Sequence, residues 1–125
     1  MTCYVYYAER YNISNRNMRS LKSYEDKDLA KIIKIGETMN RGRRNSQLRS
    51  TDSDMTITDF ISFDGEDADR KFVESYIRLK IAQSGRGEQV GNDHFRCYSV
   101  YDIRFIKKNF LKWANEALEI INNID

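Results

Sequence analysis

The sequence is poor in the residues that build several common kinds of site. It has only two cysteines, at positions 3 and 97, and a single histidine, His94. Two distant thiols and one imidazole exclude a disulfide framework and a zinc site, so we expect Cys3 and Cys97 to be small buried side chains. The sequence also has no proline, no internal repeat and no low-complexity tract, so no such segment divides it.

Long apolar runs are absent as well. No stretch approaches the roughly 20 residues that a bilayer-spanning helix needs. The first residues also lack the basic start, apolar middle and small-residue cleavage site of a secretory signal. We therefore expect a cytoplasmic protein that does not enter a membrane. A chain of 125 residues with 40% hydrophobic residues can bury one ordinary core, which predicts a single domain over residues 1–125.

The first half of the chain predicts strands separated by polar segments. Residues 2–8 are β-branched and aromatic, typical of a strand in which Tyr4 and Tyr6 share one face. Residues 9–28 are polar and predict a long surface excursion. The later elements expected here are a second strand at 32–36, a short helix at 43–49, and a third strand at 56–63 that ends at the Asp64-Gly65 turn.

The second half is dominated by two helical patterns. Apolar residues recur at helical spacing over 66–82, namely Ala68, Phe72, Val73, Tyr76, Ile77, Leu79 and Ile81. A longer apolar stripe follows the capping signal at Ser99 and predicts a C-terminal helix over about 100–122. Between them, the glycine-rich segment 84–91 reads as a loop and 94–98 as a short edge strand. These patterns predict an α+β fold, a small three-stranded, mainly antiparallel sheet flanked by helices, with a core over about 2–98.

Charge is distributed unevenly along the chain. The formal net charge of +2 is close to neutral and does not by itself indicate nucleic acid. The charged residues from 31 to 50 are basic except for Glu37, whereas the charged residues from 52 to 69 are all acidic. The basic segment contains a strand end, Lys34-Ile35-Gly36, followed by a short helix with clustered arginines. This arrangement predicts a corner that faces phosphate groups.

The order of these motifs resembles the GIY-YIG nuclease superfamily, in particular the branch of the phage T5 and meiotically up-regulated gene families. Tyr4-Val5-Tyr6 resembles the first motif and Lys34-Ile35-Gly36 the second. Arg44 matches the family's catalytic arginine, and Glu74 its metal-binding glutamate. The segment Gly91 to Phe95 is similar to the closing motif of this branch, although Leu48 and Arg78 stand where some members have histidine or tyrosine.

The resemblance implies hydrolysis of a phosphodiester bond with one divalent ion, Mg²⁺ or Mn²⁺. Glu74 would hold the metal, Arg44 would stabilise developing negative charge, and Tyr6 would lie near the attacking water. Lys34 is expected to donate to a phosphate. Arg41, Arg43, Arg49 and Arg86 are candidates for neutralising the nucleic-acid backbone without reading its sequence.

Each of these residues also has an ordinary structural interpretation. Glu74 at the border of its helix's apolar stripe fits a half-exposed carboxylate paired with Arg70, Lys71 or Arg78. A run of arginines after a turn is often a solvated helix face, and a strand tyrosine is often a half-buried core residue. A lone histidine such as His94 more often makes a structural hydrogen bond than relays a proton.

Three functions therefore follow from the sequence. The first is a metal-dependent DNA endonuclease, with RNA left open as a substrate, which selects its target through loops, the C-terminal helix, a homodimer or a partner subunit. The second is a nucleic-acid-binding protein on the same scaffold with little or no cleavage. The third is a protein-interaction module that works through its acidic stretch or its last helix.

Overall fold

The computed structural model describes residues 1–11, 31–38 and 56–124. These residues form an α+β fold with one antiparallel sheet of five strands in the order β3-β1-β2-β5-β4. The strands are β1 (Thr2–Tyr11), β2 (Lys31–Thr38), β3 (Thr56–Asp64), β4 (Glu88–Gln89) and β5 (His94–Cys97). The two described helices are α3 (Asp67–Ser84) and α4 (Val100–Asn122).

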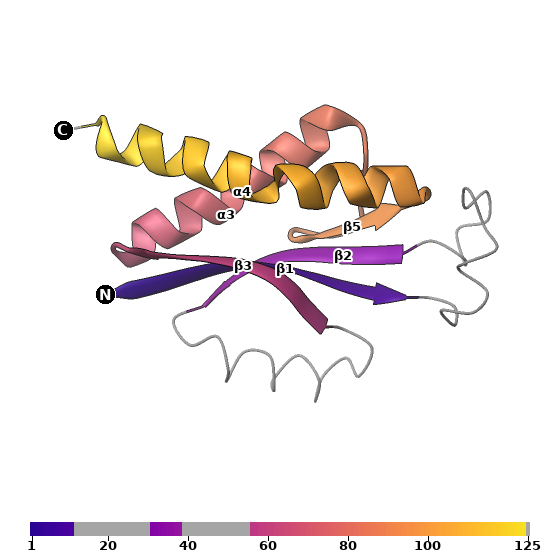
Figure 1. The fold of residues 1–125 in the computed structure, drawn as a ribbon, viewed down its shortest axis with the longest axis horizontal. Coiled ribbons are helices and arrows are strands. Elements are labelled where there is room, and N and C mark those ends of the chain that lie inside the picture. Colours follow the sequence, from indigo (N-terminus) through magenta and orange to yellow (C-terminus); the bar gives the residue numbers. More distant parts are fainter. Residues whose placement is uncertain (12–30, 39–55, 125) are drawn as a thin grey trace.

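Both helices cover the same face of the sheet (Figure 1). Strand side chains alternate between faces, so Val5 and Tyr7 of β1 and Ile33 and Ile35 of β2 point toward the helices. They pack there with the buried stripe of α4, which consists of Ile103, Ile106, Phe110, Trp113, Ala114 and Ala117. This layer between sheet and helices is the main hydrophobic core.

The opposite face of the sheet carries a second, smaller cluster. Tyr6 and Ala8 of β1 are buried there, with Ile57 and Phe60 of β3 packed against them. The register places Tyr6 opposite Gly36 and Ala8 opposite Lys34, so all four residues share this face. We call it the Tyr6 face; it contains two of the residues that the GIY-YIG resemblance singled out.

The expectation of three strands is wrong. Two-residue β4 lies within the segment 84–91 that the sequence assigned to a loop, and both of its residues are polar and exposed. Because β4 pairs with β5, β5 lies between β2 and β4 and is not the edge strand that the sequence predicted. β1 also continues through Glu9–Tyr11, residues assigned to a surface excursion, where the Tyr7 hydroxyl donates to buried Glu9 over 2.8 Å.

The helices lie close to their expected bounds. α4 begins at the expected Ser99 cap, whose Oγ accepts the Tyr101 N–H over 3.1 Å. In α3 the buried stripe is Arg70, Val73, Ile77 and Ile81, whereas Phe72 and Leu79 are exposed. Cys3 and Cys97 are free and buried, as expected. No helix within the described ranges is both long and apolar enough to cross a membrane.

Candidate functional site

Tyr6 of β1 lies directly opposite Gly36 of β2, on the Tyr6 face. The two residues are register partners in β1 and β2, and the Tyr6 side chain is 1% exposed. A Cβ atom at position 36 would overlap the hydroxyl and ring carbons of Tyr6. A glycine inside a strand often marks such a close approach. Gly36 is therefore required here because a tyrosine ring crosses its strand.

Lys34 stands two residues before Gly36 and on the same face. It is 8% exposed, and its register partner on β5 is His94. The Lys34 ammonium lies 3.8 Å from a carboxylate oxygen of Asp93. An ammonium has donors and no acceptor, so it can orient a carboxylate or a phosphate but cannot take a proton from water.

Asp93 joins Lys34 to His94. One carboxylate oxygen faces the Lys34 ammonium, and the other lies 2.7 Å from Nδ1 of His94. The Asp93 backbone carbonyl accepts the Ile35 N–H over 3.0 Å, which anchors the residue to β2 at the point where β5 begins. Both the Asp93 and His94 side chains are about one-third exposed, at 35% and 34%. They are thus accessible while Lys34 is nearly covered.

Glu74 of α3 lies within electrostatic range of Lys34 on β2 and of Asp93. Its side chain is 14% exposed, and Arg78 Nε lies 3.4 Å from its Oε1. Burial raises the pKa of the Glu74 carboxyl above its ordinary value of 4.5, against the lowering effect of Arg78. Glu37 and Asp93 raise this pKa further, and Lys34 lowers it. The carboxylate is therefore within electrostatic range of Lys34 and Asp93, in a setting that disfavours its charge.

Arg78 of α3 forms a hydrogen bond with the turn before β5. Its Nη1 donates to the Asn92 carbonyl and its Nη2 to Ser75 Oγ over 3.1 Å. Since Asn92 directly precedes Asp93, this contact holds Asp93 near Glu74. We refer to Lys34, Glu74, Arg78, Asp93 and His94 as the edge cluster.

A second ion pair fixes α3 to β2 beside the edge cluster. Arg70, 9% exposed, pairs with Glu37 and lies 3.1 Å from Asp67. Its Nη1 is buried and has no hydrogen-bond partner among the residues that the structure describes. Arg70 thus pairs with Glu37, whereas Arg78 pairs with Glu74 in the edge cluster.

The donor chemistry of Glu74 fits Mg²⁺. Magnesium commonly keeps several waters and binds through one or two carboxylates together with substrate phosphates. In the part of the chain that the structure describes, no three His, Cys, Asp or Glu side chains are grouped to hold a metal ion. Among the described residues, Glu74 would be the candidate ligand of such an ion, together with water and substrate.

The predicted residues divide into three groups. Tyr6 and Lys34 share the Tyr6 face, and Lys34 is within electrostatic range of Glu74. Arg86 lies in the turn after α3, and its side chain contacts α4 instead, with Nη1 3.3 Å from Asp102 and its guanidinium 4.8 Å from the Phe105 ring centre. The remaining predicted residues, Arg41, Arg43, Arg44 and Arg49, lie outside the described residues.

Sequence reasoning did not name Asp93 as a site residue. It lies within the Gly91–Phe95 segment, directly before the only histidine of the chain. That adjacency was the available signal, because a carboxylate beside an imidazole often orients it. The pairing with Lys34 depends on the β2–β5 register, which the sequence does not display.

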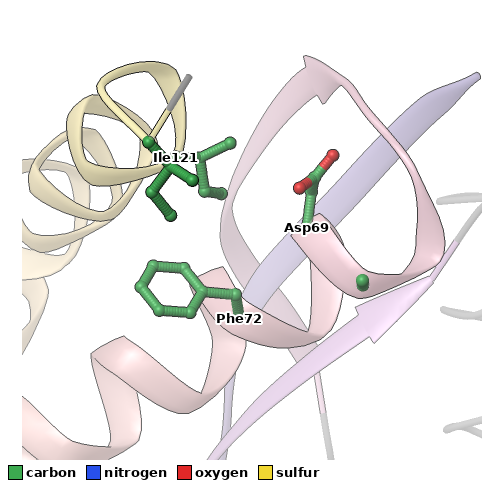
Figure 2. A pocket seen from close by; sticks show the side chains of 5 residues that line it. Asp69, Phe72 and Ile121 are labelled. Carbon is green, nitrogen blue, oxygen red and sulfur yellow. The ribbon is translucent and has the colours of Figure 1, made fainter.

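A separate hollow lies between the start of α3 and the end of α4. It measures about 420 Å³ and is lined by Ala68, Asp69, Phe72, Ile121 and Ile124. Figure 2 shows Phe72 and Ile121 facing this space from the two helices. Its lining is apolar apart from Asp69, and it shares no residue with the edge cluster.

Comparison with known proteins adds no assignment: no protein-family model, curated protein sequence or solved structure matches this chain.

Proposed function

We propose that this chain is a GIY-YIG-type endonuclease that hydrolyses phosphodiester bonds in DNA with Mg²⁺ or Mn²⁺. The observation that carries the proposal is the position of Glu74. Its largely buried carboxylate, with a raised pKa, lies within electrostatic range of Lys34 and Asp93. Arg78 only partly offsets the cost of burying this charge, and a divalent cation bound beside Glu74 would offset it further.

The placement of Tyr6 and Lys34 gives independent support. The resemblance places Tyr6 in the first motif and Gly36 in the second, and the two residues are in contact across β1 and β2. Lys34 follows on the same face with its ammonium directed at Asp93. These contacts fit an arrangement in which a phosphate approaches the Tyr6 face at the start of β5.

Glu74, Lys34 and Arg44 each have a defined task in this proposal. Glu74 would hold the metal, which when bound supplies a positive charge that polarises the phosphate. Lys34 would donate to a non-bridging phosphate oxygen and keep the scissile group in place. Arg44 is proposed, from the resemblance, as the second cation that stabilises the charge developing on phosphate.

Cleavage of supercoiled plasmid DNA tests this function. Purified wild type should nick the plasmid with Mg²⁺ or Mn²⁺ and not with EDTA. The Glu74→Gln variant should lose nicking while keeping its fold, because the amide cannot supply the negative charge that the metal needs. Glu119→Gln, which removes an exposed carboxylate on α4, is the matched control and should cleave like wild type.

DNA retardation in a gel separates the other functions. Reversing charge at Arg43 and Arg44 together should abolish retardation if the protein binds nucleic acid through its basic segment. Retardation without cleavage under any metal would favour a binding protein on this scaffold. Absence of both would favour a protein-interaction module.

A further inference from the structure

The ring of His94 lies on the Tyr6 face. β5 alternates, with Phe95 and Cys97 buried in the core under the helices and His94 and Arg96 turned the other way. His94 is also the direct register partner of Lys34. The imidazole therefore stands on the face where Tyr6 crosses Gly36 and where Lys34 reaches Asp93.

Asp93 determines which nitrogen of His94 can accept a proton. A carboxylate only accepts hydrogen bonds, so the 2.7 Å contact between Asp93 Oδ1 and Nδ1 requires Nδ1 to donate. In the neutral ring this leaves the lone pair on Nε2. Asp93 is itself held by Lys34 and by the Ile35 N–H, so the orientation of the ring is supported from two sides.

Two described groups of this site are accessible proton acceptors, Asp93 and His94. The two Asp93 oxygens already face the Lys34 ammonium and His94 Nδ1, which leaves Nε2 of His94. The resemblance implies that Tyr6 lies near the attacking water, but its side chain is 1% exposed and is not reached from solvent in this structure. Lys34 and Arg78 only donate, and Glu74 is assigned to the metal. The His94 side chain, by contrast, is 34% exposed. A proton released from an attacking water thus has a basic, reachable destination at Nε2.

We propose that His94, oriented by Asp93, is the general base of the phosphodiester hydrolysis proposed above, on which this inference rests. As the water oxygen bonds to phosphorus, one of its protons passes to Nε2 of His94. The bond from phosphorus to one ester oxygen breaks, and its electron pair stays on that oxygen, which takes a proton from solvent. The products are a phosphate monoester and a hydroxyl, and the imidazolium returns its proton to solvent.

The test compares nicking rates of wild type and His94→Ala with Mg²⁺, with and without added imidazole. A general base commonly contributes 10²- to 10⁴-fold, so we expect His94→Ala to slow nicking by about 100-fold or more. Free imidazole should restore part of this loss, because it can enter the space left by the side chain. Free imidazole should not restore nicking by Glu74→Gln, because this variant lacks the carboxylate proposed to hold the metal and still has its own imidazole.

Asp93 is the positioning residue of this pair. Asp93→Asn should lower kcat with little change in KM and should not respond to imidazole, since its own ring is still present. In the His94→Ala background, Asp93→Asn should keep only the part of its loss that acts through Lys34, because there is no ring left to orient. Two multiplicative losses would contradict this role.

The outcomes separate the inference from the function. If wild type nicks DNA, Glu74→Gln does not, and His94→Ala nicks at the wild-type rate, the general-base role is overturned and the nuclease stands. A folded His94→Ala that is slow but unresponsive to imidazole overturns the role as well. If wild type does not nick DNA with any metal, both proposals are overturned.

Discussion

The Tyr6 ring lies over the backbone of Gly36, its partner across β1 and β2. This contact joins the two positions that the GIY-YIG resemblance identified from separate parts of the sequence. It also fills the space that any side chain at position 36 would need. The glycine and the tyrosine are thus one structural unit on the Tyr6 face.

Gly36→Ala should destabilise the protein. The added methyl group would overlap Tyr6, and overpacking of this kind costs about 1–3 kcal/mol. Urea unfolding followed by the fluorescence of Trp113, the only tryptophan, measures the change. In a Tyr6→Leu background the smaller side chain leaves room, so the cost of Gly36→Ala should shrink. Equal costs in both backgrounds would show that the contact does not decide the identity of residue 36.

The Lys34–Asp93 pair should behave as a coupled unit. Asp93→Asn leaves the largely buried Lys34 ammonium without this counter-charge, and we expect a loss of about 1–2 kcal/mol, less than for a fully buried pair. Lys34→Met should cost less, because its unpaired partner Asp93 is one-third exposed. A double-mutant cycle measured by urea unfolding checks this: Asp93→Asn should be nearly neutral in the Lys34→Met background. Additive losses would contradict the pairing.

Glu74 should give the stability a specific pH dependence. Burial raises its pKa above 4.5 in the folded protein, so the folded state holds this proton more tightly than the unfolded chain does. Wild type should therefore lose stability as pH rises through the window from about 4.5 to the raised pKa. Glu74→Gln cannot ionise, so its stability relative to wild type should increase across that window and then level off. Urea unfolding at a series of pH values measures this; a relative stability that falls with pH would contradict the raised pKa.

Mg²⁺ should stabilise wild type by binding at Glu74. A ligand that binds only the folded state at a concentration of 100 times its Kd contributes about 2.7 kcal/mol. Increasing Mg²⁺ should raise the Tm of wild type and of the Glu119→Gln control, as measured by thermal unfolding. The Tm of Glu74→Gln should stay constant. An equal rise in all three proteins would place the ion elsewhere.

The fold was predictable where its pattern is strong and local. The stripe of α4 and the Ser99 cap gave the bounds Val100–Asn122 from the sequence. β4 was missed because two exposed polar residues carry no periodic signal, and without β4 the neighbouring β5 reads as an edge strand. The burial of Arg70 could not be predicted, since its partner Glu37 lies on β2, far away in the sequence.

The candidate site was predictable only in part. Tyr6, Lys34 and Glu74 were identified through motif order, which locates residues along the chain but not their contacts. The roles of Asp93 and Arg78 arise from the turn before β5, which folds back against β2 and α3. Such contacts depend on strand register, and a shift of one residue would move His94 to the other face.

The initial rate of plasmid nicking with Mg²⁺, compared between wild type and Glu74→Gln, tests the proposed nuclease most directly. We predict a metal-dependent nicking rate for wild type and for Glu119→Gln. Glu74→Gln should show no measurable rate, although its cooperative unfolding in urea shows that it is folded. Nicking by Glu74→Gln at the wild-type rate, or its absence in wild type with both Mg²⁺ and Mn²⁺, would contradict a metal-dependent site at Glu74.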